Sequence, residues 1–76
     1  MRQITRLEIA ADGERWNLNE HGIGRLSSYP TKTAATQAGQ AMARLHTPSK
    51  LIIRNDNGTI DAEHTYDRPG KPPAEG

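Results

Sequence analysis

The 76-residue chain contains no cysteine and no phenylalanine, and its only aromatic residues besides histidine are one tryptophan and two tyrosines. Without cysteine there is no disulfide and no cysteine-based metal site, and we expect a reducing, cytoplasmic location. No apolar run is long enough to span a bilayer, and the N-terminus lacks the apolar segment of a signal peptide. Because only 33% of the residues are apolar, we predict a single domain with a thin core.

Motifs that carry chemistry are missing as well. The sequence has no phosphate-binding glycine loop and no nucleophile elbow. Its three histidines, His21, His46 and His64, are not spaced as metal ligands. We interpret them as surface residues, and we predict a protein that is not an enzyme and needs no metal or cofactor.

Residues 31–46 are the only segment with helical periodicity. Thr31 is a suitable N-cap, and Pro48 cannot continue the helix. Gly39 costs about 1 kcal/mol relative to alanine within a helix, which a close backbone contact or a slight bend would explain. The outward face is expected to include Ala43 and Arg44. The stripe expected to face the core is Ala34, Ala35, Ala38, Ala41, Met42 and Leu45.

Short segments with alternating apolar residues flank this helix and read as strands. The alternation predicts that Trp16, Leu26 and Ile60 face the core. We interpret Trp16 as the anchor of the core, and ligand stacking is its alternative role. The order β-β-β-α-β-β predicts an α+β fold, a mostly antiparallel sheet with one helix packed on one face. We expect one domain over residues 1–66 and a flexible proline-rich tail over 67–76. The predicted strands are residues 4–10, 14–20, 25–29, 50–54 and 59–65.

Charge is unevenly distributed along the chain although its net value is only +1. No acidic residue lies between Glu20 and Asp56, whereas from Asp56 to Asp67 there are acidic residues but no lysine or arginine. The strand phases place several basic side chains on the sheet face opposite the helix, together with Tyr29. The candidate binding residues on that face are Arg6, Arg15, Arg25, Ile52 and Arg54.

Such a face fits several partners, and an ordinary mixed-charge surface is the remaining interpretation. It could hold nucleic-acid phosphates, dock an acidic protein, or pair with a second copy in a homodimer. In the homodimer, Asp61 and Glu63 are expected to share one strand face and to meet Arg54 of the other copy. Few aromatic residues are present to stack on bases, which weakens the nucleic-acid alternative.

The order of several short motifs resembles a small bacterial and phage family, domain of unknown function 2188. The family pattern is a W-x-V strand, a T-K-x-E-A helix start, an L-I-I strand, a D-G-x-I hairpin and a closing T/S-Y. The matching motifs, within roughly residues 5–68, are Trp16, Tyr29-Pro30-Thr31-Lys32, Leu51-Ile52-Ile53, Asp56-Asn57-Gly58-Thr59-Ile60 and Thr65-Tyr66. This chain departs from the pattern at Leu18, Ala34 and the inserted Asn57.

The resemblance implies no known activity, catalytic residue or cofactor. In layout the family is similar to small sheet-and-helix proteins of phages and mobile elements, some of which inhibit host defence complexes. Our leading hypothesis is a non-catalytic module that binds a protein partner as an inhibitor or regulator. It is based on the uncovered sheet face, the uneven charge and the lack of an active-site motif, and the family analogy adds slightly to it. A nucleic-acid-binding module that uses Arg6, Arg15, Arg25 and Arg54 is the alternative, and a homodimer is expected.

Overall fold

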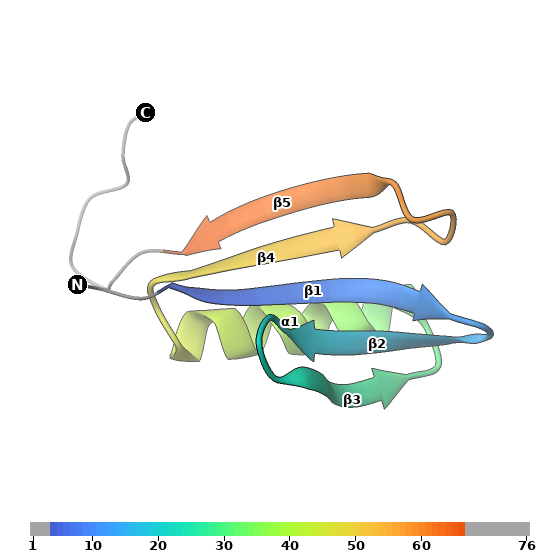
Figure 1. Cartoon of the computed structure of the whole chain (residues 1–76), viewed down its shortest axis with the longest axis horizontal. Coiled ribbons are helices and arrows are strands. Elements are labelled where there is room, and N and C mark those ends of the chain that lie inside the picture. Colours follow the sequence, from blue (N-terminus) through green and yellow to red (C-terminus); the bar gives the residue numbers. More distant parts are fainter. Residues whose placement is uncertain (1–3, 67–76) are drawn as a thin grey trace.

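The computed structural model describes residues 4–66, which form five strands and one helix (Figure 1). Each predicted element is present in the predicted order, with its ends within two residues of the segment expected from the sequence. The proposed tail over 67–76 lies outside the described residues. The elements are β1 (Thr5–Asp12), β2 (Arg15–Glu20), β3 (Gly24–Tyr29), α1 (Lys32–Leu45), β4 (Ser49–Arg54) and β5 (Ile60–Tyr66).

The strands form one sheet in the order β3-β2-β1-β4-β5 (Figure 1). The N-terminal strand β1 lies at the centre, antiparallel to β2 and parallel to β4. The outer pairs, β2 with β3 and β4 with β5, are antiparallel. The chain is therefore an α+β domain with a mostly antiparallel sheet, as the sequence predicts. The helix makes the parallel pair possible because it returns the chain to the end of the sheet where β1 begins.

The ends of α1 follow the capping signals in the sequence. The hydroxyl of Thr31 accepts a hydrogen bond of 3.1 Å from the backbone N–H of Ala34, which satisfies one free donor of the first turn. His46 is the C-cap, and its N–H donates to the carbonyls of Met42 and Ala43. The helix thus ends two residues before Pro48, where it could not continue.

A row of small residues holds the helix against the sheet. Ala35, Gly39 and Ala43 are buried, whereas Leu45 is 80% exposed. The predicted stripe is therefore wrong at three positions, because Ala43 faces the sheet whereas Ala41 and Leu45 are exposed. The sheet supplies large side chains, so the helix side with the least volume fits closest to it.

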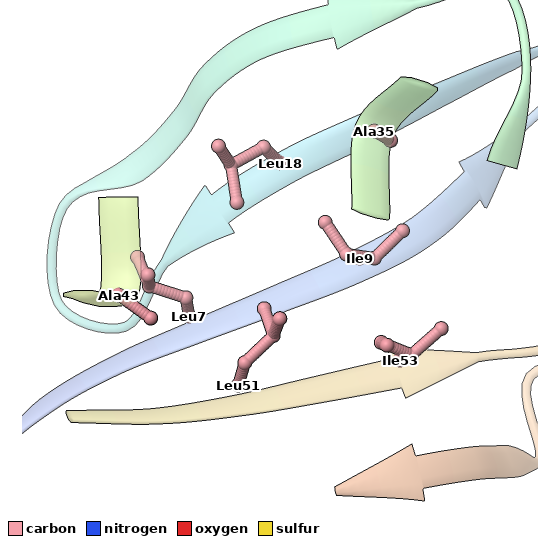
Figure 2. Close-up of a cluster of buried hydrophobic side chains, with 7 residues drawn as sticks. All are labelled: Leu7, Ile9, Leu18, Ala35, Ala43, Leu51 and Ile53. Atoms are coloured by element: carbon pink, nitrogen blue, oxygen red, sulfur yellow. The ribbon is translucent and has the colours of Figure 1, made fainter. Parts of the chain in front are cut away.

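The core is a single layer between the helix and the sheet, shown in Figure 2. Trp16 packs against this layer from its margin and is only partly buried. Trp16 therefore contributes to the core, but aliphatic side chains form its centre. At one end of the layer, the buried hydroxyl of Ser49 donates a hydrogen bond of 2.6 Å to the carbonyl of Ala43. The buried apolar residues are Leu7, Ile9, Leu18, Ala35, Ala43, Leu51 and Ile53.

Both edge strands contain a β-bulge, and each bulge corrects a predicted strand phase. In β3, Leu18 pairs with Ser27 and Asn19 with Arg25, so Leu26 is the extra residue. Leu26, predicted to face inward, is 36% exposed. Tyr29, predicted to lie on the face opposite the helix, pairs with Trp16 and packs against the core. An extra residue reverses the alternation of the strand beyond it.

The second bulge lies in β5. Ile53 pairs with Ala62 and Arg54 with Ile60, so Asp61 is the extra residue. Ile60 was predicted to face inward, but it is placed level with Arg54 and is 50% exposed. The bulge thus adds an isoleucine to the face that the helix does not cover.

We call the side of the sheet opposite α1 the open face; it is turned toward the viewer in Figure 1. Within residues 4–66, no helix or loop segment lies across it (Figure 1). The one described helix is too short and too polar to cross a membrane. The open face is therefore a surface without a structural partner among the described residues.

Enlarging Gly39 should destabilise the fold, because a Cβ there would lie 3.0 Å from Leu51 Cδ1 and 3.1 Å from Ile9 Cδ1. We expect Gly39→Leu to lower the free energy of unfolding by about 3 kcal/mol in urea titrations. Gln37→Leu, at an exposed position of the same helix, is the control and should change stability by less than about 0.5 kcal/mol. Equal stability of the two variants would show that the helix does not lie this close to the sheet.

Candidate functional site

All five candidate binding residues lie on the open face. Strand register brings Arg25, Asn19, Glu8, Ile52 and Glu63 to one level across the whole sheet. Arg6 lies two residues before this level in β1, beside Lys50 of β4. Arg54 lies two residues beyond Ile52 in β4, and Arg15 lies at the far end of β2, opposite Asp12. The predicted strand phases were thus correct for the central strands.

The four arginines of the open face differ in the hydrogen bonds and ion pairs that they form. Arg54 forms an ion pair with Glu8 and donates to the carbonyl of Gly58 at 2.9 Å. Arg15 donates to the hydroxyl of Ser28 at 2.8 Å. Arg6 and Arg25 are exposed and form no ion pair with any described residue. These two arginines are therefore available to an external anionic group.

A hollow of about 480 Å³ lies beside Arg6 on this face. Arg6, Glu8, Ile52 and Arg54 contribute to its floor, and the turn over residues 20–24 forms its wall. Ile23, in that turn, is 70% exposed. An isoleucine between two glycines is an unusual turn residue, and this pattern in the sequence could have drawn attention to the turn.

The acidic residues of β5 do not lie together, which corrects another prediction. Glu63 is level with Ile52 on the open face and lies 3.5 Å from Lys50. Asp61, the extra residue of the bulge, instead reaches Lys32 at the start of the helix, at 2.8 Å. A second copy therefore would not meet Asp61 on the face that carries Arg54.

Lys32 connects three parts of the fold. Besides Asp61, its ammonium group donates to the Asn55 side-chain oxygen at 3.0 Å and lies 5.8 Å from the centre of the Trp16 ring. The start of α1, the β4–β5 hairpin and the margin of the core are thus held by one side chain. Trp16 is covered by this contact, which favours a structural role for it over ligand stacking.

Within the described part of the chain, no group of three or more His, Asp or Glu side chains is close enough to hold a metal ion. His21 lies in the β2–β3 turn, where its backbone N–H donates to the carbonyl of Arg6. His46 is the helix C-cap, and His64 lies in β5, 6.5 Å from the Tyr66 ring. The three histidines therefore occupy separate parts of the surface.

Comparison with known proteins places the chain in a family. The model of an uncharacterized protein family conserved in bacteria, DUF2188, matches residues 8–66. The chain belongs to this family. It is also 26% identical over 55 residues to the uncharacterized protein YycD of Bacillus subtilis (strain 168), an alignment that covers 72% of this chain and 83% of YycD. No solved structure matches the chain. The DUF2188 assignment agrees with the resemblance seen in the motifs.

Removing the Lys32 ammonium group should destabilise the fold more than removing that of Lys50. Lys32 has two oxygen partners and an aromatic ring, whereas Lys50 has a single carboxylate at 3.5 Å. We expect Lys32→Met to lower the free energy of unfolding by about 1 kcal/mol and Lys50→Met by less than about 0.5 kcal/mol. Urea denaturation followed by Trp16 fluorescence measures both, and indistinguishable midpoints would contradict the role given to Lys32.

Proposed function

We propose that this DUF2188 protein is a non-catalytic module that binds a protein partner through its open face and acts as an inhibitor or regulator of that partner. The observation that carries the proposal is the composition of this face. It combines exposed isoleucines, two arginines that form no ion pair with a described residue, and a hollow, and no described element covers it. We further propose that the module acts in the cytoplasm.

Protein interfaces are built from this combination of residues. Their centres are apolar, and arginine is enriched there because it makes planar hydrogen bonds and packs its aliphatic stem. Ile52 lies at the middle of the open face, and Ile23 and Ile60 lie toward its two ends. A partner with aliphatic side chains beside carboxylates would cover the isoleucines and pair with Arg6 and Arg25.

Nucleic acid is the alternative partner, and the charges of the open face favour it less. Arg54 and Lys50 are already paired with Glu8 and Glu63. Arg15 lies at the opposite end of the strands from Arg6, next to Asp12. A phosphate backbone laid along the face would therefore meet carboxylates as well as arginines.

A capture experiment with matched variants tests the proposal. The tagged protein should retain a specific set of proteins from a lysate of its own bacterium, and Ile52→Glu and Arg6→Glu should each reduce that set at least tenfold. The controls Gln37→Glu and Arg44→Glu, at exposed helix positions, should retain it. Capture that is insensitive to the open-face variants would contradict the choice of surface.

A titration with nucleic acid separates the two partner classes. We expect no saturable binding of duplex or single-stranded DNA or RNA at an ionic strength of about 0.15 M. Tight binding that weakens steeply as salt is raised, with no protein retained, would replace the proposal with the nucleic-acid alternative.

A further inference from the structure

We infer that one partner of the open face is a second copy of this chain, with the two sheets packed face to face and their strands antiparallel. This inference rests on the proposed function, because it names an occupant for the same surface. Three features of the described residues support it: the bulges on the edge strands, the separation of basic from acidic residues along the strands, and the positions of the isoleucines.

The edges of the sheet are poorly suited to pairing with another chain. The extra residues Leu26 and Asp61 interrupt β3 and β5, the two edge strands. Bulges on edge strands twist the edge and leave a backbone group out of register, and proteins use them to prevent edge-to-edge association. Association between copies is therefore expected through a face, and α1 already covers the other one.

Basic and acidic residues on and around the open face are separated along the strand direction. The end where β1 begins carries Arg6, Arg25 and the Lys50–Glu63 pair. Its other acidic residues are Glu20 and Glu8, and Glu8 is neutralised by its ion pair with Arg54. The end where β1 finishes carries acidic residues at the last position of β1 and on the β1–β2 and β4–β5 connections, with Arg15 as the exposed cation beside them. Those acidic residues are Asp12, Glu14 and Asp56.

Only one orientation of two copies uses this polarity. A two-fold axis in the interface, perpendicular to the strands, lays the basic end of each copy over the acidic end of the other. Such an axis at the level of Ile9 and Ile53, which pair across β1 and β4, lies midway between Arg6 and Asp12. Arg6 of each copy then lies over Asp12 of the other. Parallel strands would instead place like charges together.

The same axis brings apolar side chains to the centre of the interface. Ile52 lies one level before the axis, and Ile60, which pairs with Arg54, lies one level after it. Ile52 of each copy then lies over Arg54 of the other, in the same strand β4, and the other copy's Ile60 lies one strand away in β5. The broad side of the molecule measures 38 × 25 Å, which is large enough for the roughly 800 Å² per partner that a standard interface buries.

Charge reversal with rescue tests this arrangement by sedimentation equilibrium at concentrations up to about 500 µM, well above the micromolar range of weak interfaces. Wild type should sediment at twice its 8.4 kDa mass. Arg6→Glu and Asp12→Arg should each raise the dimer dissociation constant about tenfold, because every contact occurs twice. The double variant Arg6→Glu/Asp12→Arg should recover the wild-type constant, and Arg44→Glu, on the helix, should match wild type.

Disulfide trapping adds a test of geometry, because the native chain contains no cysteine. The double variant Arg6→Cys/Asp12→Cys should form a covalent dimer on mild oxidation, and Arg6→Cys alone should not. Both positions are exposed, and circular dichroism should confirm that each variant folds.

Each outcome of these experiments bears on a different part of the argument. A monomer at every concentration would overturn the homodimer, while lysate capture that depends on Ile52 would leave the proposed function standing. A dimer that survives the single charge reversals, or that forms no disulfide, would overturn the antiparallel face-to-face arrangement. Failure of lysate capture together with a dimer that persists in Ile52→Glu would remove both proposals.

Discussion

The close approach of the helix to the sheet is the constraint on which the rest of this fold depends. A chain with no phenylalanine and 33% apolar residues can build only one thin layer of core, and that layer is well packed only if the backbones lie near each other. Ala35, Gly39 and Ala43 recur at four-residue spacing and leave room for the leucines and isoleucines of the central strands. The price of Gly39 in helix propensity is thus offset by packing. All the fully buried apolar residues lie on one side of the sheet as a result, and the other side keeps its mixed surface.

The regular parts of this structure could be read from the sequence, because capping residues and alternating apolar positions are local signals. Thr31 and Pro48 bound the helix, and the alternation of β1, β2 and β4 sets which side chains face the core. The helix face was harder to predict. A hydrophobicity pattern selects Leu45, whereas the sheet selects the side with the least volume. The order of the strands in the sheet could not be predicted either, because it depends on contacts between segments far apart in the chain.

The positions of the candidate binding residues could likewise be predicted only where the strands are regular. Four of the candidate residues lie on the open face because β1, β2 and β4 keep a regular alternation, and Arg25 lies there because it precedes the bulge of β3. The bulges at Leu26 and Asp61 have no local sequence signal, so Tyr29, Ile60 and Asp61 were placed on the wrong side. The ion pairs of Arg54 and Lys50 likewise join separate strands. They convert what looks like a strongly basic stretch of sequence into a surface with basic and acidic ends.

The central position of β1 has a consequence for how the protein is made. Its parallel partner β4 begins at Ser49 and is followed by the β5 hairpin, so one side of β1 stays unpaired until β4 has left the ribosome. The β1–β3 meander that emerges first has apolar side chains but no helix to cover them, so these side chains stay in contact with water. Non-local pairing of this kind slows folding. The domain is therefore expected to fold in one step only after β4 and β5 have been synthesised, and premature termination before β4 should leave a product for proteases to remove.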